Sequence, residues 1–174
     1  MNIRSSSAQE LEAIRSLHLN AFGEPEGPVI VSLVEAMLID KSAEPRFSFV
    51  VENAGDILGH VIFSTVKIDQ HPEIRASILC PLGIAGNHQK QGLGTRLIAH
   101  GLTALKQQNV EIVFVLGDPA YYSRCGFSAG HDISPPYELP YPEAWMATEL
   151  APGALANISG RVQCAESLMQ REYW

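Results

Sequence analysis

A short glycine-rich stretch holds the residues whose types and spacing are most informative for chemistry: Gln89-Lys90-Gln91-Gly92-Leu93-Gly94-Thr95. It lies between an expected strand and the start of an expected helix, where backbone N–H groups are unpaired and the helix dipole is positive. Glycines let an anionic group approach the backbone closely, and Lys90 adds a positive charge. The stretch therefore predicts a site for a phosphate or pyrophosphate. A tight strand–helix turn without a ligand is the structural alternative.

Two familiar nucleotide-binding loops do not fit this stretch. A Walker A loop requires G-x-x-x-x-G-K-[ST], and the chain contains no such run. The dinucleotide fingerprint requires G-x-G-x-x-G, and Leu97 stands where its third glycine is needed. A different class of phosphate-containing ligand is expected.

Two motifs resemble those of a known family. Leu82-x-Ile84 followed by Gln89-x-x-Gly92-x-Gly94 resembles the acetyl-coenzyme A motif of the GNAT superfamily of acetyltransferases. Further along, Tyr122-Ser123-Arg124-Cys125-Gly126-Phe127 resembles the family's Y-x-[KR]-x-G-F. The resemblance covers roughly residues 1–130, and the run 116–122 is most similar to the YhbS-type N-acetyltransferases.

The resemblance implies acetyl-coenzyme A as cosubstrate, with no metal. It implies that Leu82, Gly83 and Ile84 lie along the pantetheine arm. Around the pyrophosphate it places Gln89, Lys90, Gln91, Gly92, Leu93, Gly94 and Thr95. Tyr122 aligns with a tyrosine near the coenzyme A sulfur and is the candidate general acid for the leaving thiolate.

The function implied by the resemblance is direct transfer of an acetyl group to a primary amine of a small molecule or a protein. Two alternatives remain open: a non-catalytic acyl-coenzyme A sensor or interaction module, and a transferase that uses another acyl group or an oxygen acceptor. The acceptor pocket is expected from residues 22–28, the 69–75 loop and the proline-rich segment 134–143.

No general base is evident from the sequence. Glu24 and Glu26 lie in the loop 22–28, where solvated carboxylates are the structural alternative. His60 lies in the middle of an expected strand. Cys80 lies near the point where two parallel strands are expected to diverge. For each residue, a role in the core is the structural alternative. A proton relayed by water is therefore the expected mechanism.

Hydrophobic periodicity predicts the elements that position these residues. A short strand at 3–5 precedes helices at 7–21 and 29–40, and His18 falls on the apolar face of the first. Strands are expected at 47–52, 57–68 and 76–84, with Pro81 marking a bulge or break. A helix at 92–108, a buried strand at 110–116, a short helix at 120–124 capped by Asp118 and a strand at 143–150 follow.

This order predicts a mixed α/β fold. The resemblance adds a twisted, mostly antiparallel mixed sheet, helices on both faces and a splayed parallel strand pair. One domain is expected over residues 1–174, with a core at 1–130 and C-terminal strands and a proline-rich loop at 131–174. A homodimer is compatible with this reading.

Composition narrows the classes of partner. The net charge of −7 disfavours nucleic acid and favours cationic partners such as amines. No apolar run reaches the ~18 residues that span a bilayer, and the N-terminus lacks the apolar stretch of a signal peptide, so no membrane and a cytoplasmic location are expected. Three widely spaced cysteines and the histidine spacing predict neither a disulfide framework nor a metal site.

Overall fold

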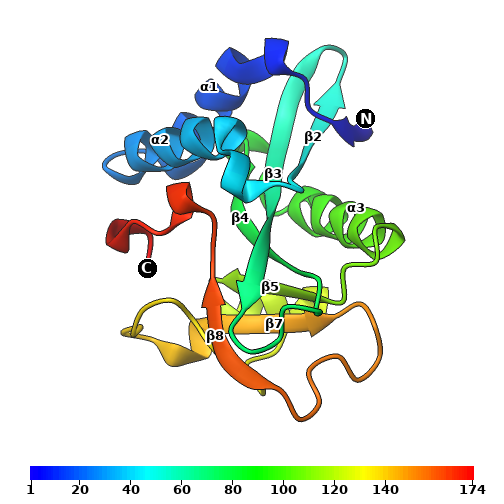
Figure 1. Ribbon diagram of the computed structural model, residues 1–174. Coiled ribbons are helices and arrows are strands. Elements are labelled where there is room, and N and C mark those ends of the chain that lie inside the picture. The colour runs from blue at the N-terminus through cyan, green and yellow to red at the C-terminus, as the bar shows by residue number, and fades with distance from the viewer.

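An eight-stranded twisted sheet organises the chain, whose computed structural model describes all residues from 1 to 174 (Figure 1). The main path runs in the order β1-β2-β3-β4-β5-β7, and β8 pairs with β3 and β6. The strands are β1 (Asn2–Ser5), β2 (Phe47–Asn53), β3 (Asp56–Ile68), β4 (Ala76–Ile84), β5 (Ile112–Leu116), β6 (Asp132–Ser134), β7 (Trp145–Glu149) and β8 (Ser159–Gln163). The helices are α1 (Leu11–Phe22), α2 (Glu26–Ile39), α3 (Leu93–Gln107) and α4 (Pro119–Tyr122). The mixed, mostly antiparallel sheet is confirmed.

The parallel pair β4–β5 opens at its carboxyl end. Pairing runs from Ala76 opposite Ile112 to Leu79 opposite Val115, and β4 then continues alone on that side to Ile84. On the other side, two residues of β4, Cys80 and Pro81, lie opposite one residue of β3. This bulge is the irregularity predicted at Pro81, because proline has no N–H to give to a ladder. The last residues of β4 therefore present a free backbone edge.

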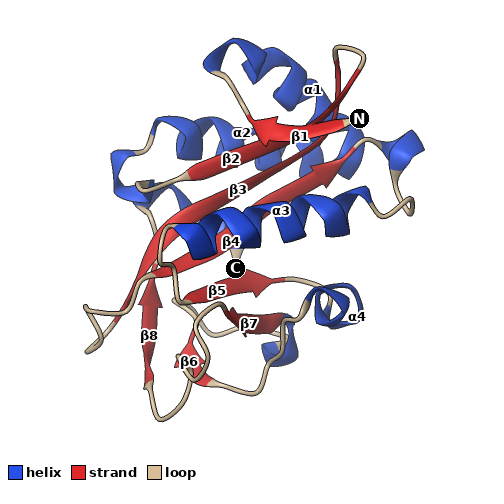
Figure 2. Ribbon diagram, turned by 90° about the vertical axis from the view of Figure 1, so that its right-hand side faces the viewer, coloured by secondary structure: helices blue, strands red, loops and turns tan.

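Helices cover both faces of the sheet, as predicted (Figure 2). On one face α1 and α2 pack against the strands, with Leu33 and Met37 fully buried. On the other face α3 buries Leu97 and Leu105. Each helix contributes an apolar stripe, so the sheet is sandwiched between two hydrophobic layers.

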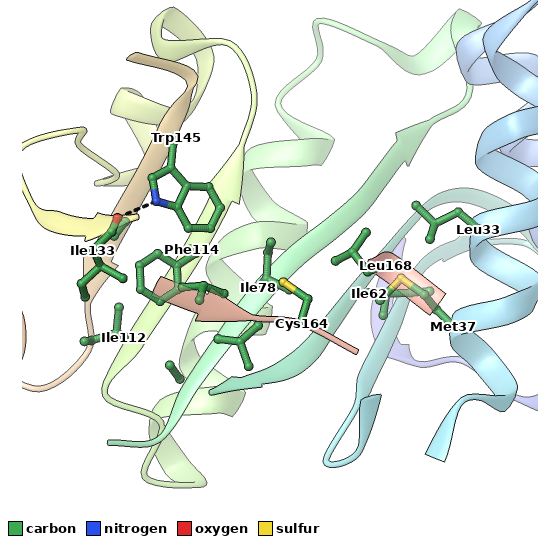
Figure 3. Packing of buried hydrophobic residues seen from close by; sticks show 14 of the residues in the cluster. Leu33, Met37, Ile62, Ile78, Ile112, Phe114, Ile133, Trp145, Cys164 and Leu168 are labelled. Atoms are coloured by element: carbon green, nitrogen blue, oxygen red, sulfur yellow. Dashed lines mark hydrogen bonds between the residues drawn. The ribbon is translucent and has the colours of Figure 1, made fainter. Parts of the chain in front are cut away.

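The C-terminal segment completes the first layer (Figure 3). Trp145 stacks on Phe114 with ring centroids 5.1 Å apart, and its indole Nε1 donates to the Ile133 carbonyl at 2.9 Å. Cys164 and Leu168 are buried in the same cluster. Residues after 130 therefore share the core of the residues before them.

Several boundaries differ from the sequence predictions. The first helix opens with a 3₁₀ turn, where the Glu10 carboxylate accepts from the Ser7 N–H at 2.7 Å. α2 begins at Glu26 rather than 29, because Pro28 is tolerated in the first turn of a helix. The bounds of β6 and β8 were not predicted, since both are short and largely polar. None of the helices combines the length and the apolar character that a membrane-spanning segment requires.

Candidate functional site

The glycine-rich stretch forms the N-terminus of α3. Gly92 is the N-cap and adopts a left-handed conformation with φ of 79°, which favours glycine. The Arg96 N–H makes the first helical bond, to the Gly92 carbonyl, so the preceding amides of Leu93, Gly94 and Thr95 have no partner within the helix. Three N–H groups at the positive end of a 15-residue helix suit an anionic ligand.

A cleft of about 520 Å³ lies in front of these amides and is called the glycine-loop cleft here. It is lined by Ala21, Phe22, Leu82, Gly83, Ile84, His88, Gln89, Lys90, Gly92, Leu93, Gly94, Thr95, Asp118, Tyr121 and Arg124. Of the predicted cosubstrate residues, only Gln91 does not line it. The Gln91 amide instead donates to the Asn87 carbonyl at 3.1 Å. The free edge of β4 and the α3 amides thus face one cavity.

Gln89 has a structural task within this cleft. Its side-chain amide donates to the Ile84 carbonyl at 3.1 Å and lies 3.5 Å from the Ala21 carbonyl. The contact ties the end of β4 to the end of α1. The Gln89 side chain therefore holds the loop in place.

Two cations line the glycine-loop cleft in a chain whose net charge is −7: Lys90 and Arg124. The Arg124 guanidinium lies over the Tyr121 ring, 5.5 Å from its centroid. This cation–π contact fixes the approach of Arg124 to the cleft. The local charge is opposite to that of the whole molecule, as an anion site requires.

Tyr121 and Tyr122 lie on α4, whose N-cap Asp118 accepts from the Ala120 N–H at 2.9 Å, as predicted. A Cβ at position 94 would overlap the Tyr121 hydroxyl, so only glycine leaves room for that tyrosine. Tyr121 packs against the core cluster beneath α3 and also lines the glycine-loop cleft. Its signal in the sequence was adjacency to Tyr122, which did not distinguish the two.

Tyr122 occupies the opening between β4 and β5. Its ring packs against Gly117, where a side chain would collide with it, and lies edge-on to Phe127. Burial raises the pKa of the Tyr122 hydroxyl above its usual value of 10, so this side chain is a protonated donor at neutral pH. Tyr122 lines a second cleft and not the glycine-loop cleft.

The second cleft, about 640 Å³, is called the apolar cleft. Thirteen of its 19 lining residues are hydrophobic. The lining comes from the α1–α2 region, β4, the end of β5, α4 and the C-terminal segment: Phe22, Pro25, Glu26, Val29, Ile30, Leu33, Ile78, Leu79, Cys80, Pro81, Leu82, Leu116, Gly117, Asp118, Tyr122, Leu168, Glu172, Tyr173 and Trp174. Phe22, Leu82 and Asp118 line both clefts, which therefore meet at the splay.

The three segments predicted to wall an acceptor pocket do not all line one cleft. The turn at 22–28 does line the apolar cleft, but the 69–75 loop does not. The proline-rich segment borders a separate cleft with His131 and Arg161. Its Tyr137 ring lies 6.4 Å from that of Trp174, which lines the apolar cleft. The place of the proline-rich segment in the apolar cleft is taken by the last residues of the chain, which return along α2 (Figure 1). Asp40 holds them there by accepting from the N–H and hydroxyl of Ser167.

The candidate general bases lie in different surroundings in the folded protein. Glu26 lies at the rim of the apolar cleft, whereas Glu24 does not line it. Burial raises the pKa of the Cys80 thiol to about 12, so Cys80 is neutral at pH 7. His60 is fully buried and pairs with His18 at 2.8 Å between Nδ1 and Nε2. His18, which periodicity assigns to an apolar helix face, is the polar residue that sequence reasoning missed.

Comparisons with known proteins agree with this architecture. The acetyltransferase (GNAT) family matches residues 11–127. The uncharacterized N-acetyltransferase YjhQ of Escherichia coli is 34% identical over 161 residues, covering 88% of this chain and 86% of YjhQ. YhbS of Escherichia coli is 34% identical over 118 residues, covering 66% of this chain and 69% of YhbS.

Solved structures extend the match to nearly the whole chain. The crystal structure of YhbS from Escherichia coli in complex with coenzyme A has a TM-score of 0.87 at 27% identity, over 98% of this chain and 92% of that one. A GNAT acetyltransferase from Brucella melitensis in complex with acetyl-coenzyme A has a TM-score of 0.69 at 25% identity, over 96% of this chain and 97% of that one. With the splayed strands, the glycine loop and these matches together, the chain belongs to the GNAT family of acetyltransferases.

Proposed function

We propose that this acetyltransferase moves an acetyl group from acetyl-coenzyme A to a primary amine held in the apolar cleft. The observation that carries the proposal is the junction of the two clefts. A ligand whose phosphates lie at the α3 amides and whose arm follows the free edge of β4 reaches Phe22 and Leu82, where the apolar cleft begins. The reacting thioester would then face the acceptor.

The residues that line the glycine-loop cleft offer the hydrogen-bonding groups and the charge that suit coenzyme A. The amides of Leu93, Gly94 and Thr95, with Lys90 and Arg124, offer hydrogen bonds and positive charge to phosphates. The unpaired edge of β4 beyond Leu79 offers N–H and C=O groups to the amides of a pantetheine arm, as an added strand would use them.

The lining of the apolar cleft supports one chemical class of acceptor. Its floor is hydrophobic, and its charged lining residues are Glu26, Asp118 and Glu172, all exposed and all acidic. An ammonium group would be attracted to this rim and the carbon skeleton to the floor. We therefore infer a monoamine with an apolar body, either a small molecule or an amino group next to apolar side chains of a protein.

Tyr122 is the proposed donor to the leaving thiolate. Because burial raises the pKa of its phenol well above that of a thiol, full proton transfer is costly and hydrogen bonding to the sulfur is its main contribution. The neutral thiol of Cys80 is a poor nucleophile, which favours direct attack by the amine over an acetyl-cysteine intermediate.

The test measures coenzyme A release with acetyl-coenzyme A as donor and a panel of amines. The panel compares turnover of phenylalkyl and alkyl monoamines with turnover of polyamines and aminoglycosides. We expect turnover with the apolar monoamines, a higher KM for them in Glu26→Gln, and in Tyr122→Phe unchanged affinity for acetyl-coenzyme A with a kcat lower by about tenfold or more. Glu24→Gln is the matched control because Glu24 lies outside the cleft.

Each outcome has a separate meaning. A protein that does not bind coenzyme A in calorimetry contradicts the cosubstrate assignment. Binding without transfer to any amine supports a sensor or interaction module. Faster turnover with polyamines than with apolar monoamines contradicts the acceptor class, and equal kcat in Tyr122→Phe removes Tyr122 from the mechanism.

A further inference from the structure

Three aromatic rings form a partition between the apolar cleft and the cleft beside the proline-rich segment, which has a volume of about 700 Å³ and is called the third cleft here. Trp174 lines the apolar cleft, whereas Tyr137 and Trp145 line the third cleft. The Trp174 ring lies 5.8 Å from the Trp145 ring and 6.4 Å from the Tyr137 ring, measured between centroids. No residue lines both clefts, so these ring contacts separate the two cavities.

Trp174 is held firmly in this partition. Its indole Nε1 donates to the Leu168 carbonyl at 2.8 Å, which fixes the ring against its own segment. Behind it, Trp145 is buried and stacks on Phe114, 5.1 Å away (Figure 3). A ring packed against buried neighbours cannot swing aside without opening a void, so the partition resists a ligand that presses against it.

Tyr137 supports the partition from the side of the third cleft. Its hydroxyl donates to the Met169 carbonyl at 2.7 Å, and the Arg171 guanidinium lies over its ring, 5.6 Å from the centroid. Met169 and Arg171 belong to the same C-terminal segment as Trp174. The proline-rich segment therefore acts on the apolar cleft from behind, by holding Trp174 in place.

The partition lies away from the cleft assigned to the cosubstrate. The apolar cleft meets the glycine-loop cleft at Phe22, Leu82 and Asp118, and Trp174 does not line the glycine-loop cleft. An amine whose nitrogen lies at this junction extends its carbon skeleton into the rest of the apolar cleft. Trp174 is the boundary of that cleft toward the third cleft.

We propose that Trp174 sets the maximum length of the acceptor's apolar body, an inference that rests on the proposed function. Each methylene that an amine buries in the apolar cleft strengthens its binding about fourfold. Once the skeleton reaches Trp174, further methylenes remain in water and add no affinity. The acceptor is therefore a monoamine whose apolar body fits between the splay and Trp174, and Trp174 is a specificity-determining residue.

The test measures how acetyl transfer depends on the length of the acceptor. Linear alkylamines from ethylamine to dodecylamine are compared by kcat/KM in the wild type and in Trp174→Ala. In the wild type, kcat/KM should rise about fourfold per methylene and then level off at a limiting length. Trp174→Ala should move this limit to longer chains. In that variant, an amine two methylenes longer than the wild-type limit should gain about tenfold or more over the amine at the limit.

Further variants separate length selection from a structural role. Trp174→Phe also loses the hydrogen bond to Leu168 but keeps a ring, so its limit should stay near that of the wild type. Trp174→Leu leaves a smaller packing defect than Trp174→Ala, and its limit should lie between the other two. Tyr141→Ala is the matched control, because Tyr141 is an exposed aromatic residue that lines neither cleft. A purely structural role would lower kcat/KM by one factor at every chain length.

Calorimetric titration of the same amines into the coenzyme A complex gives the limiting length from binding alone. The role of Trp174 would be overturned by a kcat/KM that rises through dodecylamine in the wild type, or by one limit shared by the wild type and Trp174→Ala. A limit in Trp174→Phe that moves as far as in Trp174→Ala would also overturn it. These results leave the proposed function intact. Absence of transfer to any amine would overturn the proposed function, and the binding limits would still decide the role of Trp174.

Discussion

Gly92 and Gly94 lie two residues apart at the start of α3, and each position requires glycine for a different physical reason. Alanine at each position separates these two reasons. At Gly92 a Cβ would meet nothing within 4 Å, but φ is 79°. The cost is therefore conformational, roughly 1–2 kcal/mol for an L-residue in the left-handed region. If the loop of the Gly92→Ala variant moved to relieve about 1 kcal/mol of this strain, binding of coenzyme A would have to restore the strained conformation. The Kd for coenzyme A would then rise by about fivefold at most.

Gly94 has ordinary helical geometry, and alanine there would favour the helix by about 1 kcal/mol on propensity alone. The obstacle is Tyr121, whose hydroxyl occupies the place of a Cβ and whose Cζ lies 3.4 Å from it. Forcing a methyl group into a packed contact costs roughly 1–3 kcal/mol. Because Tyr121 lines the glycine-loop cleft, its displacement should raise the Kd for coenzyme A about tenfold or more.

Calorimetric titration with coenzyme A and urea unfolding of both variants measure the two effects. We expect Gly92→Ala to lose mainly stability and Gly94→Ala to lose mainly affinity. In the double variant Gly94→Ala/Tyr121→Ala the methyl group has room, so the two changes should not be additive. Wild-type affinity in Gly94→Ala, or additive losses in the double variant, would refute the steric explanation.

Two other predictions concern the positions of His18 and Asp40. Burial lowers the pKa of His18 from 6.5 to about 4, so the folded protein binds fewer protons than the unfolded chain between these values, and the stability present above pH 6.5 is lost as the pH falls toward 4. His18→Phe should reduce this loss in Tm measurements from pH 7 to 4, and an identical pH dependence in the variant would contradict it. Asp40→Ala removes the acceptor that holds Ser42 and Ser167, so the C-terminal wall of the apolar cleft should loosen. The KM for the amine should rise while the Kd for coenzyme A stays constant, and the reverse pattern would show that Asp40 acts elsewhere.

The lining of the glycine-loop cleft, the proposed cosubstrate site, could be predicted from the sequence because its parts are close together along the chain. Leu82 to Thr95 covers the end of one strand, a turn and the start of one helix. Backbone amides at a helix N-terminus need no distant partner to bind an anion, so glycine spacing and the strand–helix order were sufficient. Asp118 as the cap of α4 was predicted for the same reason.

The apolar cleft and the histidine pair depend on contacts between residues far apart in the sequence, which no local pattern predicts. His18 and His60 are 42 residues apart, and Asp40 and Ser167 are 127 apart. Periodicity places His18 among apolar residues, and only the folded structure shows that it lies against Gly83 and pairs with His60. The sequence alone therefore predicted the glycine loop and the strand edge at which we propose that coenzyme A binds. Only the tertiary structure showed that the apolar cleft lies next to the glycine-loop cleft. Its walls depend on the return of the C-terminus and on the approach of α1 to β4, which are set by packing across the whole core.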